Sequence, residues 1–139
     1  MKTKIKEIDI EHNLESFFTQ EKDEGCIVSR QVYFGGKKID MVLVLNESVS
    51  SIEVKISDWR GALRQANLNR LACDYSYVAM WHEDAGRAVD HLEDFVRLKV
   101  GLIIIDENST PFILYTPKRE TNGRLLDFSR SCLLASATG

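Results

Sequence analysis

Cysteine pairs, long apolar runs and an excess of positive charge are all missing from this chain of 139 residues. The three cysteines, Cys26, Cys73 and Cys132, have neither the number nor the spacing of a disulfide framework or a zinc site. We expect them to be reduced, and mostly buried as small hydrophobic residues. The longest apolar run, 100–105, is far shorter than the ~20 residues of a membrane-spanning helix. No membrane partner is therefore expected.

The start of the chain also lacks the pattern of a signal peptide, because charged and polar residues follow the basic stretch 1–6. We therefore expect a cytoplasmic protein. The length fits one domain, 1–139, and a composition of 44% hydrophobic and 28% charged residues excludes a disordered chain. The net charge of −3 is unlike that of proteins that coat duplex DNA, although it says nothing about a local basic patch.

Hydrophobic periodicity predicts a helix followed by three strands. Apolar residues recur at helical spacing from Asp9, the expected N-cap, to about Lys22. Stretches rich in β-branched residues then predict strands over 26–34, 39–45 and 51–56. The pair Gly35-Gly36 predicts the first turn, and the polar stretch 46–50 the second.

The second half predicts a helix over 58–73 capped by Ser57 or Asp58, a strand over 75–81, a helix over 85–98 and short strands over 100–105 and 111–115. The rest, from Lys118, is polar and then weakly helical. Short connections make the first three strands antiparallel, and the helix 58–73 is long enough to place the fourth strand parallel to the third. We expect an α/β fold with a mixed central sheet flanked by helices, in the order αβββαβ, then a helix and two short strands.

Three ionisable residues stand inside the predicted central strands: Asp40, Glu53 and Lys55. Since a strand alternates its faces, Glu53 and Lys55 share one face, and hairpin pairing lets Asp40 approach Glu53. Buried carboxylates need compensating charge, and Mg²⁺ is commonly held by one or two of them. With Glu11 from the first helix, three carboxylates and one ammonium sum to −2, which one divalent ion neutralises. The arrangement is consistent with a metal site.

Taken without its context, the pattern is better explained by cross-strand pairing of Glu53 and Lys55 on an exposed strand face. The context favours the metal site, because the strand that holds Asp40 is apolar on both faces beyond it and a helix with two arginines follows. Glu11 and Glu15 lie one helical turn apart, and we favour Glu11. Glu7 is expected to precede the helix.

Asp40, then Glu53-Val54-Lys55 after a hairpin, then a helix bearing Gln65 together resemble the PD-(D/E)xK nuclease superfamily, whose fold is restriction-endonuclease-like. The resemblance, strongest to small stand-alone members, covers about 11–80, with a domain core of about 9–81. One departure is that the residue before Asp40 is an isoleucine in place of a proline.

The resemblance implies that Asp40 and Glu53 bind Mg²⁺, or Mn²⁺ as a substitute, with the Val54 carbonyl as a further candidate ligand. It also implies that Lys55 orients or deprotonates the attacking water. Glu11 would be an outer ligand through water. Gln65 matches a helix glutamine that lies near the site in many members of the superfamily.

The expected function is that of a Mg²⁺-dependent DNA endonuclease. Arg60, Arg64 and Asn67 recur at i, i+4 and i+7, and with Lys38 they could contact DNA phosphates, although a solvated helix face explains the helical strip as well. A homodimer is expected because one small site cuts one strand. A separate targeting protein is a further expected partner, because the sequence shows no specificity domain.

The alternative is a non-catalytic nucleic-acid-binding or protein-interaction domain with the same fold. The joint presence of Asp40, Glu53 and Lys55 favours the enzyme, because a domain that only binds needs no such combination.

Overall fold

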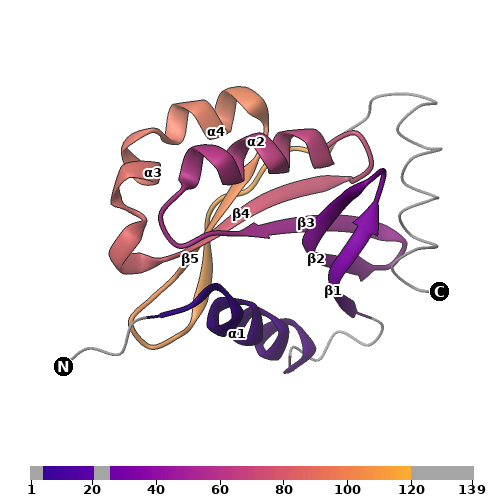
Figure 1. Ribbon diagram of the computed structural model, residues 1–139, viewed down its shortest axis with the longest axis horizontal. Coiled ribbons are helices and arrows are strands. Elements are labelled where there is room, and N and C mark those ends of the chain that lie inside the picture. The colour runs from indigo at the N-terminus through magenta and orange to yellow at the C-terminus, as the bar shows by residue number, and fades with distance from the viewer. Residues whose placement is uncertain (1–4, 21–25, 120–139) are drawn as a thin grey trace.

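The structure is a computed structural model that describes residues 5–20 and 26–119 (Figure 1). Its elements, in chain order, are α1 (Glu7–Gln20), β1 (Ile27–Phe34), β2 (Lys37–Leu45), β3 (Ser48–Val54), α2 (Trp59–Asn69), β4 (Tyr75–Trp81), a 3₁₀ turn η1 (His82–Asp84), α3 (Gly86–Asp90), α4 (Leu92–Leu98), β5 (Gly101–Ile105) and β6 (Pro111–Tyr115). The strands form one sheet in the order β1-β2-β3-β4-β5-β6. The expected α/β fold and the order αβββαβ are confirmed.

The sheet is mixed because its connections differ in length. Short turns make β1, β2 and β3 antiparallel neighbours, whereas α2 carries the chain across so that β4 pairs parallel with β3. The next crossover, through α3 and α4, makes β5 parallel to β4, and β6 returns antiparallel to β5. The parallel centre is mostly buried on both faces, as expected for strands covered on both sides. Most of its buried side chains are apolar, and Ser51, Glu53 and Ser76 are the buried polar ones.

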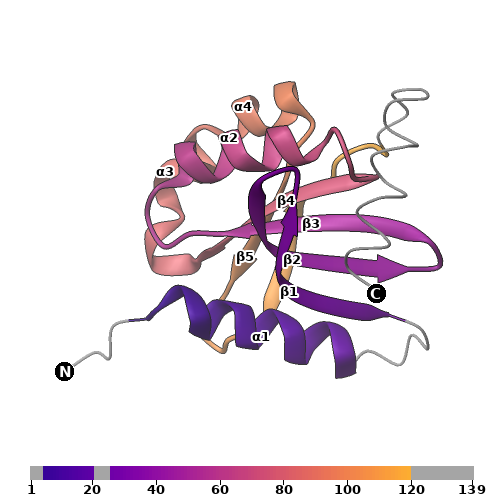
Figure 2. The ribbon, with the colours of Figure 1, turned by 45° about the vertical axis from the view of Figure 1, so that its right-hand side comes forward.

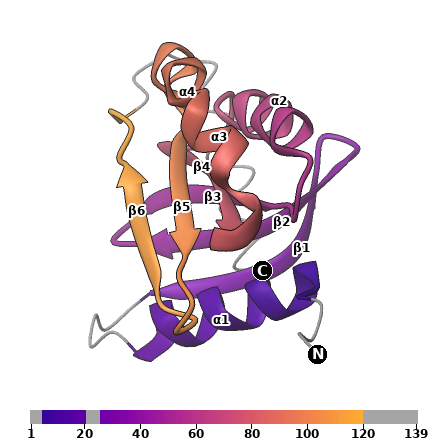
Figure 3. The same ribbon diagram turned by 90° about the vertical axis from the view of Figure 1, so that its left-hand side faces the viewer.

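The helices cover opposite faces of the sheet. α1 lies against one face, and α2, α3 and α4 lie against the other (Figure 2, Figure 3). Strand alternation explains this division: Ile52 and Val54 pack with Ile10 of α1, whereas Val78 and Met80 pack beneath α2. Glu53, between Ile52 and Val54, therefore points to the α2 side.

The start of α1 differs from the sequence prediction. The helix begins at Glu7, because the Lys6 carbonyl accepts hydrogen bonds from the backbone N–H groups of Asp9 (3.0 Å) and Ile10 (3.3 Å). Asp9 thus lies in the first turn and is not the N-cap, and the expectation that Glu7 precedes the helix is wrong.

At α2 the Asp58 cap is confirmed, since its side chain accepts a hydrogen bond from Gly61 N at 3.0 Å. This helix ends at Asn69, earlier than predicted.

The helix predicted over 85–98 is divided into α3 and α4. His91 lies between them with φ −112, and its ring stacks on Trp59 at 4.7 Å between centroids. Ala88 and Phe95 are buried, whereas Val89 and Val96 are exposed. The break at His91 separates the two helical segments, so no single stripe of apolar residues runs through both.

The strands follow the sequence prediction more closely. β4 and β6 have the predicted bounds, 75–81 and 111–115. β3 begins earlier, at Ser48, because Asn46 and Glu47 alone form the turn, both with positive φ as in a two-residue hairpin. It ends at Val54 instead of residue 56. No helix in the described part is both long and apolar enough to span a membrane.

Two sequence predictions reach beyond the described part. Cys132 and the weakly helical segment, from residue 120 on, lie outside it. Cys73 is buried as expected, and its burial raises the pKa of the thiol to about 12. Cys26 is only partly buried.

Candidate active site

Asp40 and Glu53 meet where β2 and β3 stop pairing through their backbones. The last paired residues on that side are Met41 and Ile52. Beyond them Val54 N donates to Asp40 Oδ2 at 2.9 Å, and Asp40 N donates to Glu53 Oε2 at 3.4 Å. Side-chain carboxylates thus replace backbone carbonyls as acceptors at this end of the hairpin. The expected approach of Asp40 to Glu53 on one face of the sheet is present.

Glu53 is the buried member of the pair, with 4% of its surface exposed. Asn69 Nδ2 donates to its Oε2 at 3.0 Å. Burial raises the pKa of Glu53 to about 7, and the negative charge of Asp40 acts in the same direction, while the hydrogen bonds and Lys55 lower it. The protein groups around Glu53 thus do not fully compensate its negative charge, and a bound cation would supply what is missing.

A cavity of about 350 Å³ opens above the two carboxylates. Its lining comes from α1, β2, β3, the residue after β3, and α2: Glu7, Lys37, Lys38, Asp40, Glu53, Lys55 and Gln65. Three carboxylates and three ammonium groups make it formally neutral, but they are unevenly placed. Glu53 is buried, whereas Lys37 and Lys38 are exposed. A cation would therefore be favoured beside the acids, and an anion beside these two lysines.

Glu7 is the acid that the first helix contributes to this cavity. Its Oε1 lies 4.0 Å from Lys55 Nζ, and both side chains are more than a third exposed, so the pair restrains Lys55 only weakly. The sequence prediction favoured Glu11, one turn further along, over Glu15. The earlier start of α1 brings Glu7 to the cavity instead.

Glu11 is engaged elsewhere and does not line the cavity. Glu11 is buried, and its Oε1 accepts hydrogen bonds from Arg30 Nε at 3.2 Å and from Gln31 Nε2 at 2.9 Å. Arg30 also bonds Glu15 Oε1 at 3.3 Å. The structure therefore differs from the expectation that Glu11 is the helix acid of the site: Glu11 and Glu15 tie α1 to β1.

Of the four residues predicted to contact DNA, one lies at the cavity and three lie elsewhere, on α2. Lys38 lines the cavity, whereas Arg60, Arg64 and Asn67 do not. Arg64 is exposed on α2, and the Arg60 guanidinium lies over the Trp59 ring at 4.9 Å from its centroid. Asn67 Oδ1 accepts a hydrogen bond from Arg70 Nη1 at 2.9 Å. Asn67 is therefore bonded to Arg70, the C-cap residue of its own helix.

Asn69 is a site residue that the sequence pattern did not predict. It lies one helical turn after Gln65, on the side of α2 that faces β3, and is buried. The spacing from Gln65 was the sequence signal that could have indicated Asn69, but only the contact between helix and sheet shows that its amide meets Glu53.

Val54 was predicted as a candidate metal ligand through its carbonyl. In the structure its backbone N–H donates a hydrogen bond to Asp40.

No group of three or more His, Cys, Asp or Glu side chains within residues 5–20 and 26–119 is placed to hold a metal ion. Two carboxylates are nevertheless a common protein contribution to Mg²⁺ binding, because that ion keeps several waters and shares the phosphate of its substrate. Asp40 and Glu53 fit that description in donor chemistry.

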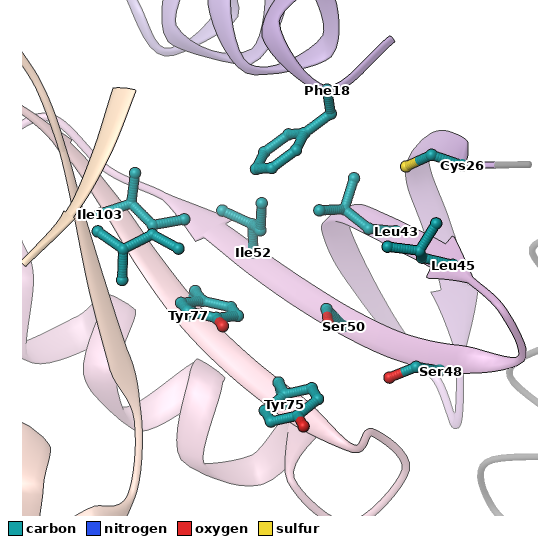
Figure 4. A pocket seen from close by; sticks show the side chains of 11 residues that line it. Phe18, Cys26, Leu43, Leu45, Ser48, Ser50, Ile52, Tyr75, Tyr77 and Ile103 are labelled. Atoms are coloured by element: carbon teal, nitrogen blue, oxygen red, sulfur yellow. The ribbon is translucent and has the colours of Figure 1, made fainter. Parts of the chain in front are cut away.

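A second cavity, of about 220 Å³, lies on the opposite face of the sheet. Phe18 projects from α1 toward Ile52, and Tyr75 and Tyr77 of β4 line the same space (Figure 4). Because Ile52 and Glu53 are neighbours on one strand, this cavity and the carboxylates are separated by the sheet. The two tyrosines therefore line an apolar cavity and lie away from the carboxylates.

No protein-family model matches the sequence, and no curated protein does either. A solved structure of SfsA from Pyrococcus furiosus, in complex with Ca²⁺, is similar over 81% of this chain and 60% of the SfsA chain. The sequence identity is 11% and the TM-score 0.40. The chain thus spans less than two thirds of the length of SfsA.

Proposed function

We propose that this protein is a Mg²⁺-dependent DNA endonuclease that hydrolyses phosphodiester bonds, of the PD-(D/E)xK type. The observation that carries the proposal is the meeting of Asp40 and Glu53, from two strands, at one cavity that Lys55 also lines. A purely structural pair of acids would be paired with basic groups, as Glu11 is with Arg30. Glu53 instead retains a raised pKa of about 7.

Asp40 and Glu53 would hold Mg²⁺, with the Val54 carbonyl as a further candidate ligand and Mn²⁺ as a substitute ion. When bound, the ion supplies positive charge that stabilises the phosphate and the leaving oxygen during hydrolysis. The hydrogen bond from Val54 N keeps Asp40 Oδ2 directed at β3, and Asn69 holds Glu53 Oε2. The protein therefore supports each carboxylate through one of its two oxygens.

Lys55 would orient the attacking water, since its ammonium group lies on the same face as Glu53 and lines the cavity. Gln65, on the wall formed by α2, is placed to contact the substrate phosphate or that water. Lys38 would bind a neighbouring phosphate, and the exposed arginines Arg60 and Arg64 would extend the contact with the DNA backbone along α2.

The test is cleavage of plasmid and labelled oligonucleotides in Mg²⁺ or Mn²⁺ by the wild type, Asp40→Asn and Lys55→Ala. We expect both variants to lose at least about a hundredfold in rate, as removal of a transition-state contact commonly does. Glu93→Gln, an exposed acid on α4, is the matched control and should cut like the wild type. Equal cleavage by all four proteins would refute the proposed site.

A non-catalytic DNA-binding domain is the second candidate, and the absence of a third clustered ligand among the described residues favours it. It predicts DNA binding without cleavage in either metal.

The two expected protein partners have their own tests. Light scattering of the same samples tests the expected homodimer. Cleavage that appears only when a second protein is added would indicate the targeting partner.

A further inference from the structure

An apolar groove of about 160 Å³ lies next to the candidate active site. It is formed where the β1–β2 turn comes up beside the C-terminal end of α2 (Figure 1, Figure 2). Phe34 lines it from the turn, and Leu68 and Leu71 line it from the helix side. Leu68 is 40% exposed and Leu71 is 51% exposed, so apolar surface that could be buried faces solvent.

The groove lies beside the cavity that holds the carboxylates. Lys37 lines both spaces. Asn69, whose amide bonds Glu53, is also a wall of the groove. Gln65, which lines the cavity, and Asn69, which lines the groove, are four residues apart on α2, or about 6 Å along the helix axis. One ligand of modest size can therefore occupy both.

Such a ligand must carry a small apolar group next to an anion. Lys37 and Lys38 are exposed beside the groove, and neither makes an ion pair with a carboxylate of the described residues. A nucleotide has this combination, with a base for the apolar walls and a phosphate for the lysines. A base stacked inside a duplex cannot enter a groove, because its faces and its pairing edge are already covered.

We infer that this groove is the subsite for one unpaired base next to the phosphate in the cavity, so that the protein acts on DNA at single-stranded or unpaired positions. The inference rests on the proposed function and adds the substrate class to it. Phe34 offers an aromatic ring to such a base, and Leu68 and Leu71 close the other side.

The binding test uses fluorescein-labelled oligonucleotides without metal, so that it does not depend on cleavage. Anisotropy is measured for a fully paired duplex, for the same duplex with one unpaired nucleotide, and for that duplex with an abasic site at the unpaired position. We expect the unpaired nucleotide to tighten binding about five- to a hundredfold, and the abasic site to remove this gain. Equal binding of all three would overturn the inference.

Leu71→Ser is the variant test, and Val96→Ser is its control. Both residues are exposed apolar side chains, but only Leu71 lines the groove. Leu71→Ser should lose the preference for the unpaired nucleotide, and Val96→Ser should keep it. Retained preference in Leu71→Ser would overturn the inference. If this variant fails to fold, the anisotropy measurement of the abasic duplex with the wild-type protein still tests the inference.

Cleavage in Mg²⁺ separates the two proposals. A base-dependent gain in binding without any cleavage would refute the endonuclease and leave the subsite standing. Cleavage that is equally fast at paired, unpaired and abasic positions would refute the subsite and leave the endonuclease standing.

Discussion

Neutralising Glu53 should stabilise the metal-free protein above pH 7. In Glu53→Gln the side chain keeps its size and one oxygen, which can still accept the hydrogen bonds from Asn69 and from Asp40 N. Only the negative charge beside Asp40 is lost. Because burial and this neighbouring charge raise the pKa of Glu53, removing the charge removes an unfavourable contribution to folding.

The magnitude follows from the pKa of the folded state. The pKa of Glu53 rises from 4.5 to about 7. A tenfold difference in proton affinity between folded and unfolded chains corresponds to about 1.4 kcal/mol, so the ionised side chain costs about 3 kcal/mol of stability when fully ionised. The folded chain binds the proton of Glu53 more tightly than the unfolded chain does. The contribution of protonated Glu53 to the free energy of unfolding is therefore fully present below pH 4.5, and it is lost as the pH rises through about 7.

Urea unfolding in EDTA at pH 5 and pH 8 measures the effect. We expect Glu53→Gln to exceed the wild type by up to about 3 kcal/mol at pH 8 and by less than about 1 kcal/mol at pH 5. Mg²⁺ should reverse the order at pH 8, because it binds the folded wild type and adds about 4.1 kcal/mol at a thousand times its dissociation constant.

Glu11→Gln is the matched control. Glu11 is buried like Glu53, but its carboxylate bonds Arg30 and Gln31. Its neutralisation should therefore destabilise the protein at pH 8, by about 1–3 kcal/mol. A Glu53→Gln protein that is less stable than the wild type at pH 8 in EDTA would refute the view that Glu53 carries uncompensated charge.

Three further predictions test other parts of the structure. Asn69→Leu should weaken Mn²⁺ binding at Glu53, measured by electron paramagnetic resonance, while secondary structure is kept; unchanged affinity would mean that the amide does not position the carboxylate. Phe95→Ala should cost about 3–5 kcal/mol in urea unfolding, because Phe95 is fully buried between α4 and the sheet, and a loss below 1 kcal/mol would contradict that packing. Gly36→Ala should destabilise the β1–β2 turn by about 1 kcal/mol because its φ is +77, whereas Gly86→Ala in α3 should be neutral or stabilising; equal thermal shifts would contradict the turn conformation.

Local sequence patterns were sufficient to predict most of the sheet. Alternation placed Glu53 and Lys55 on one face, and Gly35-Gly36 marked the first turn, where both residues have positive φ. The bounds of β4 and β6 were also predicted correctly. These features depend on neighbours within a few residues, which is the range over which periodicity and turn preferences act.

The helix boundaries were predicted less well, with consequences for the site. One turn of difference at the start of α1 exchanges Glu11 for Glu7 at the cavity, because residues one turn apart project at different heights along the helix. Two hydrogen bonds to the Lys6 carbonyl decide that start. A pattern of apolar residues defines which face of a helix is buried, but it does not define where the helix begins.

What the sequence determined by itself was the order of elements and the acidic and basic residues that the central strands carry. Only the tertiary structure decided which partner each of these residues meets: Asn69 for Glu53, Arg30 for Glu11, and the β1–β2 turn for the end of α2. The reason is that periodicity specifies the direction of a side chain relative to its own element. The contacts across elements depend on how helices and strands distant in sequence are placed against one another.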